Sequence, residues 1–237
     1  MLSSMFDIRC EWGENGVIQL APDSDAVIIV DVMSFSTATQ MAISRGATVY
    51  PYRFKDDSAV EFSNSVDAEL AGSRGKSKFS LSPNSLMNIP SGTRLVLPSP
   101  NGATLTLLTG NIPTLAGCLR NSRSIAKIAS RYGKRISVIP AGERWRNDGG
   151  LRPAFEDFLG AGAIIRYLDG YRSPEAEAAL AVFDRFKDNL HQLLKQCTSG
   201  KELIDMGFED DIATIAELDC DDCVPILKGS VYVRADT

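Results

Sequence analysis

Acidic and hydroxylated side chains gather at points where apolar segments of the chain end. Asp31 lies at the end of the apolar segment 26–32, and Ser34, Ser36 and Thr37 follow it directly. A carboxylate in such a position costs several kcal/mol unless it is paired or bound to a metal. Hydroxyls and free amides at the start of a helix can bind phosphate, although ordinary helix capping explains them equally well.

A second polar group follows the apolar segment 94–97. Ser99, Asn101 and Gly102 belong to a turn rich in proline and glycine that precedes a short helical pattern. A plain turn is the simpler explanation of these residues in isolation. Their position after a strand-like segment makes them candidates for substrate binding.

A third group begins at Glu143, after the apolar segment 135–140. The loop that Glu143 opens contains Arg144, Arg146 and Arg152, and arginines in such a loop could hold an anionic substrate. A solvated loop is the alternative explanation.

Glu156 and Asp157 begin a segment that is apolar on nearly every face. Acidic residues are favoured in a first helical turn, so the helix dipole alone could explain them. A helix this apolar must be buried, however, and its first turn then opens onto a cleft. Together with Asp31, these carboxylates would suit Mg²⁺, which prefers oxygen ligands and keeps several waters.

The elements that position these residues alternate between β-branched apolar segments and amphipathic ones. This pattern predicts an α/β fold in which a mostly parallel sheet has helices on both faces. The C-terminal part is expected to be helical, with an edge hairpin after it, and residues 1–237 are expected to form a single domain. Ligands of such sheets bind beyond the carboxyl ends of the strands, where Asp31, Asn101 and Glu143 lie. The predicted strands are 26–32, 48–52, 94–97, 114–116, 135–140, 224–226 and 231–234. The predicted helices are one that ends at Gly46, one that begins at Pro153, and the segments 56–70, 103–108, 121–132, 174–195 and 201–218.

Composition excludes several classes of function. The chain has 237 residues, a net charge of -5 and no basic stripe, so nucleic-acid binding is not expected. No apolar stretch reaches the ~20 residues that a membrane span needs, and the N-terminus does not resemble a secretory signal. The five scattered cysteines favour free thiols in a reducing cytoplasm.

Several phosphatase and nucleotide-binding mechanisms lack the residues that they need. The chain has one histidine, so histidine-based metal centres and phosphohistidine intermediates fit poorly. Met33 occupies the second position of what would be an Asp-x-Asp nucleophile motif. No P-loop, no Gly-x-Gly-x-x-Gly and no Gly-x-Ser-x-Gly motif occurs. Cys220 and Cys223 form a lone pair without the second ligand pair that structural zinc requires.

Five motifs in the same order resemble the 2-phosphosulfolactate phosphatase family. They are Asp-Val-Met-Ser-Phe-Ser-Thr-Ala-Thr at 31–39, Ser-Pro-Asn-Gly-Ala-Thr at 99–104, Ala-Gly-Glu at 141–143, Glu-Asp-Phe-Leu-Gly-Ala-Gly at 156–162, and a closing segment from Ser199 to Pro225. The resemblance covers nearly the whole chain. Many relatives carry Arg at the position of Ser34, so another arginine, such as Arg144, Arg146 or Arg152, would have to bind the substrate anion here.

The resemblance implies Mg²⁺-dependent hydrolysis of 2-phospho-3-sulfolactate to 3-sulfolactate and phosphate, which in methanogens feeds coenzyme M biosynthesis. Asp31, Glu156 and Asp157 would hold the metal, and Asp31, Asp157 and Glu143 would act in catalysis. The expected partner is a small anionic phosphorylated metabolite, and a homodimer would be unsurprising. Another small phosphorylated hydroxy acid as substrate, or a non-catalytic domain that binds an anionic metabolite, are the alternatives. The residues expected to contact substrate are Ser34, Ser36, Thr37, Ser99, Asn101, Gly102, Arg144 and Arg152.

Overall fold

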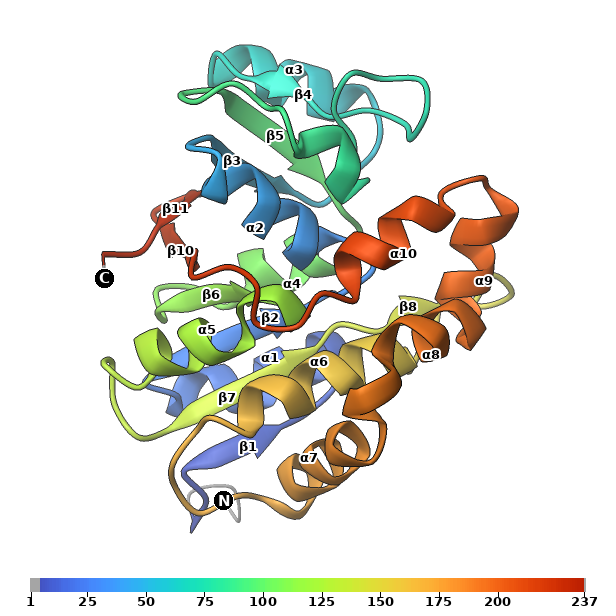
Figure 1. Ribbon diagram of the computed structural model, residues 1–237. Helices are drawn as coiled ribbons and strands as arrows, with labels where there is room; N and C mark the ends of the chain where they lie inside the picture. The colour runs from blue at the N-terminus through green and yellow to red at the C-terminus, as the bar shows by residue number, and fades with distance from the viewer. Residues whose placement is uncertain (1–4, 237) are drawn as a thin grey trace.

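A single twisted sheet forms the centre of the molecule in the computed structural model, which describes residues 5–236 (Figure 1). Within these residues, nine strands pair in the order β1-β7-β2-β6-β10-β11-β3-β5-β4, and β8 and β9 pair separately. The strands are β1 (Ile8–Cys10), β2 (Ala26–Val30), β3 (Thr48–Tyr52), β4 (Glu69–Leu70), β5 (Arg94–Pro98), β6 (Thr114–Gly117), β7 (Ile136–Pro140), β8 (Glu143–Arg144), β9 (Leu151–Arg152), β10 (Pro225–Lys228) and β11 (Val231–Arg234).

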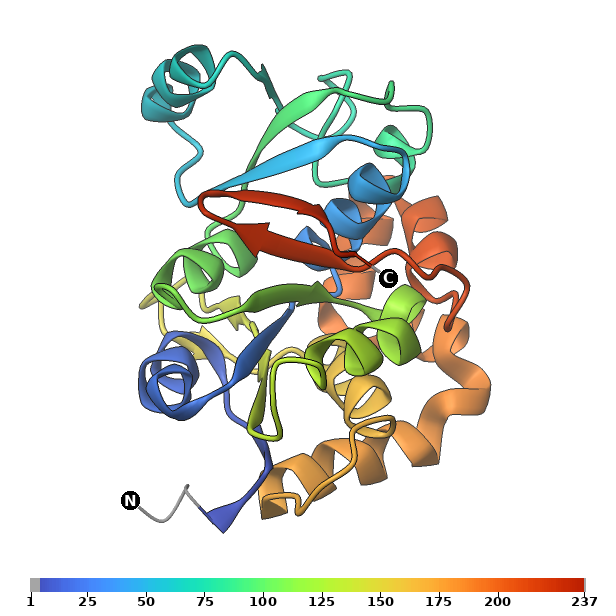
Figure 2. The same cartoon turned by 90° about the vertical axis from the view of Figure 1, so that its left-hand side faces the viewer.

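Helices cover both faces of this sheet, as the α/β prediction requires. Figure 2 shows α1, α3 and α4 on one face and α2, α5 and α6 on the other. The predicted helix 174–195 is interrupted by a short 3-10 turn at Lys187–Asn189, and the segment 201–218 divides into two helices. The helices are α1 (Gly13–Leu20), α2 (Phe35–Ser44), α3 (Asp57–Ser65), α4 (Gly102–Leu108), α5 (Ser122–Ala129), α6 (Phe155–Ile165), α7 (Pro174–Phe186), α8 (Leu190–Gln196), α9 (Thr198–Asp205) and α10 (Glu209–Ile215).

The C-terminal hairpin lies inside the sheet, where the sequence predicted an edge position. β10 pairs antiparallel with β6, and β11 pairs antiparallel with β3. The physical reason is burial, because Ile226 and Tyr232 are too apolar and too well covered to lie on an open edge. The hairpin therefore joins two parallel sets, β1-β7-β2-β6 and β3-β5-β4, which run in opposite directions along the ladder.

The strand that carries the site, β2, is buried along its whole length. Its five residues are all apolar, which is typical of a parallel strand covered on both faces. Helix α6 packs on it closely at Gly160, where an added Cβ would lie 2.6 Å from Val32 Cγ2. Gly162 allows an equally close approach of α7. This packing fixes the first turn of α6 against the end of β2.

No helix among residues 5–236 combines the length and the apolar character that crossing a membrane requires.

Candidate active site

Asp31 anchors the loop that follows β2. Its carboxylate is buried, with Oδ1 accepting from the Phe35 amide at 3.1 Å and Oδ2 from the Gly102 amide at 2.9 Å. The second bond depends on glycine, because a Cβ at position 102 would lie 2.8 Å from Oδ2 and 2.5 Å from the Phe35 ring. Asp31 therefore joins the end of β2 to the start of α4, although these elements are far apart in the sequence.

The hydroxyls of Ser36 and Thr37 hold this loop in shape. Ser36 Oγ donates to the Ile29 carbonyl at 3.0 Å and accepts from the Asp31 amide at 3.0 Å. Thr37 Oγ1 donates to the Val32 carbonyl at 2.8 Å. Both side chains are fully buried, so these hydroxyls, which we predicted to bind phosphate, are committed to the backbone.

Asp157 joins the first turn of α6 to two strand ends. Its Oδ1 accepts from the Val32 amide at 2.7 Å, and its Oδ2 accepts from the Gly142 amide at 2.8 Å. Gly142 has a φ of +69°, a left-handed conformation that favours glycine. The buried carboxylate thus lies between the loops after β2 and β7, as the position of these strands in one parallel set allows.

Glu143 and Asn101 meet across the same end of the sheet. Asn101 Nδ2 donates to Glu143 Oε2 at 2.7 Å. Burial raises the pKa of Glu143 to about 7, and the nearby charges of Asp31 and Glu156 act in the same direction. A carboxyl with this pKa can exchange a proton near neutral pH.

The carboxylates of this group disfavour one another's ionisation. Burial raises the pKa of Asp31, against the opposing effect of the amides that it accepts from. Burial also raises the pKa of Asp157 well above its usual range, and the charges of Asp31, Glu156 and Glu143 add to that effect. We call Asp31, Glu143 and Asp157 the carboxylate cluster. Its surplus of negative charge favours binding of a cation.

Two cations that the sequence analysis missed lie close to the carboxylate cluster. Lys55 follows β3, and its charge interacts with those of Asp31 and Glu143. Arg74 lies in the loop after β4, donates a hydrogen bond to Ser34 Oγ and interacts with the same two carboxylates. Lys55 lies just beyond the carboxyl end of a strand, which is the signal that could have found it. Arg74 carries no such signal, because its loop resembles an ordinary solvated one.

The other predicted substrate-binding residues are not all gathered here. Arg144 pairs with Glu14 on the surface, and Arg152 lies 3.4 Å from Glu202 Oε2. Ser99 is buried, and its amide donates to the Tyr52 carbonyl at 2.8 Å, which ties the end of β5 to β3.

The donor chemistry of the carboxylate cluster fits Mg²⁺, but not through the three carboxylates that we predicted. In the part of the chain that the structure describes, no group of three or more His, Cys, Asp or Glu side chains is arranged to hold a metal. Glu156 lines a separate pocket beside Cys197. Mg²⁺ commonly uses one or two protein carboxylates and completes its shell with water and substrate phosphate. Asp31 and Asp157 match that need, since each carboxylate oxygen has a lone pair left after accepting one amide.

Comparison with known proteins identifies the group to which this site belongs. The family model described as 2-phosphosulpholactate phosphatase matches residues 17–230. A relative from Methanothermobacter thermautotrophicus named 2-phosphosulfolactate phosphatase is 31% identical over 86% of this chain and 88% of its own length. Two further relatives are named probable 2-phosphosulfolactate phosphatase. The one from Gloeobacter violaceus is 29% identical over 87% of this chain and 91% of its own length. The one from Caldanaerobacter subterraneus is 25% identical over 86% of this chain and 88% of its own length.

The matched region includes every residue of the carboxylate cluster, together with Lys55 and Arg74. The family is one of phosphoric monoester hydrolases, and the protein is an enzyme of that class. The chain belongs to the 2-phosphosulfolactate phosphatase family.

Proposed function

We propose that this protein hydrolyses the phosphate ester of 2-phospho-3-sulfolactate, giving 3-sulfolactate and phosphate, with Mg²⁺ as its cofactor. The observation that carries the proposal is the carboxylate cluster, in which Asp31 and Asp157 are buried and fixed by backbone amides. A family of phosphatases supplies the reaction type, and the names of its relatives supply the substrate.

Asp31 and Asp157 are the side chains that would hold the metal. Bound Mg²⁺ supplies a Lewis acid that polarises the phosphoryl group and neutralises charge on its oxygens. The four amide hydrogen bonds to these two carboxylates keep them aligned before substrate arrives, so little reorganisation is needed during the reaction.

Glu143 is the group best suited to move a proton. Its pKa of about 7 lets it accept a proton from the attacking water or return one to the leaving hydroxyl near neutral pH. Asn101 holds one of its oxygens at 2.7 Å, which leaves the other oxygen for the reacting groups.

The test is phosphate release by the purified protein. With 2-phospho-3-sulfolactate as substrate, we expect release that EDTA abolishes and Mg²⁺ restores. Asp31→Asn and Asp157→Asn should each lower kcat/KM at least about 100-fold, the size found when a group that stabilises transition-state charge is removed. Asp205→Asn, at an exposed position on α9, is the matched control and should retain activity. Full Mg²⁺-dependent activity in both site variants would refute the roles assigned to them.

A panel of phosphorylated hydroxy acids tests the substrate separately. We expect 2-phospho-3-sulfolactate to give the highest kcat/KM of the panel. A clearly better substrate among the other phosphorylated acids would keep the reaction type and overturn the substrate assignment.

The cytoplasm is the proposed location of this activity. All five cysteines are free in the structure, and two of the most deeply buried, Cys10 and Cys118, lie within the core. Unpaired thiols are typical of proteins kept in a reducing compartment. Labelling the denatured protein, isolated under trapping conditions, with a thiol reagent should give five modified cysteines.

A further inference from the structure

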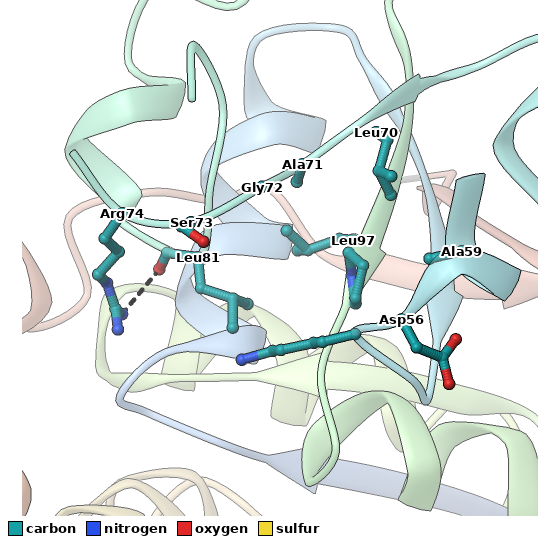
Figure 3. A pocket seen from close by; sticks show the side chains of 11 residues that line it. Asp56, Ala59, Leu70, Ala71, Gly72, Ser73, Arg74, Leu81 and Leu97 are labelled. Carbon is teal, nitrogen blue, oxygen red and sulfur yellow. Dashed lines mark hydrogen bonds between the residues drawn. The ribbon is translucent and has the colours of Figure 1, made fainter. Parts of the chain in front are cut away.

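A cavity of about 240 Å³ lies beside α3 and β5 (Figure 3). It adjoins the carboxylate cluster through Lys55 and Arg74, whose charges interact with those of Asp31 and Glu143. Its walls include the apolar side chains of Leu70, Leu81 and Leu97, and its charged groups include Lys55 and Arg74. The cavity thus places two cations beside a site that we propose for phosphoester hydrolysis. It is the right kind of space for a small ligand that carries more than one negative charge.

Arg74 is held in place by groups from three parts of the chain. It donates to Ser34 Oγ and, at 3.1 Å, to the Leu81 carbonyl, a bond drawn in Figure 3. Its Nε lies 3.8 Å from Asp211 Oδ2 and makes no hydrogen bond within the described part of the chain. Arg74 therefore has a fixed position, and its Nη1 is the guanidinium nitrogen that remains for a ligand, because Nη2 makes both hydrogen bonds and Nε is buried against Asp211.

Asp211 acts from behind Arg74. It lies in the first turn of α10, is only 2% exposed, and accepts a hydrogen bond from Ser82 Oγ at 2.6 Å. A buried carboxylate and a guanidinium next to it each offset the cost of burying the other's charge, so removing either one leaves an uncompensated charge. The first turn of α10 thereby contacts the loop that carries Arg74.

Lys55 is the second cation that lines the cavity. Among residues 5–236 it makes no hydrogen bond and no ion pair within 4.0 Å. Burial lowers the pKa of Lys55, the charge of Arg74 acts in the same direction, and the charges of Asp31 and Glu143 oppose both. Two cations that repel one another across a cavity are stabilised together when an anion lies between them.

We infer that Arg74 and Lys55 form the subsite for the acid group of the substrate that is not phosphoryl, its sulfonate or its carboxylate, and that Asp211 is the residue that positions Arg74. The inference rests on the proposed function. The phosphoryl group would lie at the carboxylate cluster, where Mg²⁺ would be held, and the second acid at the cavity. A guanidinium can donate charge-assisted hydrogen bonds to either acid. The residues of this subsite would then decide which phosphate esters the enzyme prefers.

Kinetics with four phosphate esters test this assignment. They are 2-phospho-3-sulfolactate, 2-phospholactate without the sulfonate, 2-phosphooxyethanesulfonate without the carboxylate, and ethyl phosphate without either. Arg74→Ala should raise KM for the first ester by about 10- to 100-fold, the size expected for lost charge-assisted hydrogen bonds. KM for ethyl phosphate should not change. Whichever single-acid ester loses affinity with it identifies the acid that Arg74 binds.

Three further variants separate a binding role from a folding role. Arg74→Lys keeps the charge and should recover part of the affinity, and Asp211→Asn should raise KM for 2-phospho-3-sulfolactate while leaving KM for ethyl phosphate unchanged. Lys76→Ala, an exposed lysine two residues from Arg74, is the matched control and should behave as wild type. An equal rise in KM for all four esters, or no rise in KM for any of them, would overturn the inference.

Calorimetry with 3-sulfolactate, which lacks phosphate, does not depend on turnover. Wild-type protein should bind it, and both Arg74→Ala and Lys55→Ala should weaken binding at least about 10-fold. If phosphate release fails but this dependence is found, the proposed function is wrong and the anion subsite stands. If phosphate release is normal and binding does not depend on either residue, the subsite assignment is wrong.

Discussion

Gly102→Ala should disable the site without removing any functional group. The added Cβ would lie 2.5 Å from Phe35 Cδ1 and 2.8 Å from Asp31 Oδ2. Carbon atoms prefer separations of about 3.5–4.0 Å, so α4 and the Asp31 loop would have to part by roughly 1 Å. That shift would break the 2.9 Å hydrogen bond from the Gly102 amide to Asp31. A displacement of this size at a reacting group costs about 100-fold in rate.

The assays are phosphate release and thermal unfolding. We expect kcat/KM to fall about 100-fold and the unfolding free energy to fall by about 1–3 kcal/mol, the usual cost of overpacking. Gly150→Ala is the matched control, because Gly150 has an ordinary φ and its nearest neighbour, at 3.1 Å, is an Asp148 side-chain oxygen. If Gly102→Ala retains wild-type kcat/KM, Asp31 does not need this hydrogen bond and the reasoning is refuted.

Three other perturbations follow from the structure. In EDTA, the melting temperature should fall as pH rises from about 5 to about 7.5. The reason is that the pKa of Glu143 is raised to about 7 in the folded protein. A carboxyl with a raised pKa stabilises the fold below its unfolded pKa, and this stabilisation is lost as pH rises through the folded pKa. Glu143→Gln should flatten this fall, and a slope unchanged in that variant would contradict the raised pKa. Tyr232→Phe removes the 2.9 Å hydrogen bond to Thr106 Oγ1 and should lower the unfolding free energy by about 1 kcal/mol in denaturant titrations, whereas Tyr132→Phe, at an exposed position, should leave it unchanged. Arg144→Ala removes a surface ion pair with Glu14, worth about 0–1 kcal/mol, and an exposed hydrogen bond to the Gly149 carbonyl, so kcat/KM should stay near wild type. A large rise in KM would instead place Arg144 in the substrate site.

Much of the site could be predicted because its signals are local. Asp31 at the end of an apolar segment, Glu143 after a strand and Asp157 at the start of a buried helix are visible in the order of residues alone. Strand β3 and strand β11 have the bounds that the sequence predicts. Burial of β2 follows from its five apolar residues. Such features depend on periodicity over a few residues, which the sequence carries directly.

The sequence did not reveal β1, because three residues that include Arg9 show no apolar periodicity. It also could not show that Ser36 and Thr37 would turn inward to bond the backbone of their own loop, since a hydroxyl at a helix start fits both roles. Which of the two roles these hydroxyls take depends on how closely α2 packs behind β2, and that is a property of the folded chain.

What the sequence by itself determined is the set of elements and the acids at their ends. Only the tertiary structure decided which elements are neighbours: that the C-terminal hairpin enters the middle of the sheet, that Gly102 approaches Asp31, and that Asp211 from α10 supports Arg74. The physical reason is range. Strand and helix formation follow from nearby residues, whereas the pairing of strands and the meeting of charges depend on contacts between segments that lie tens to more than a hundred residues apart.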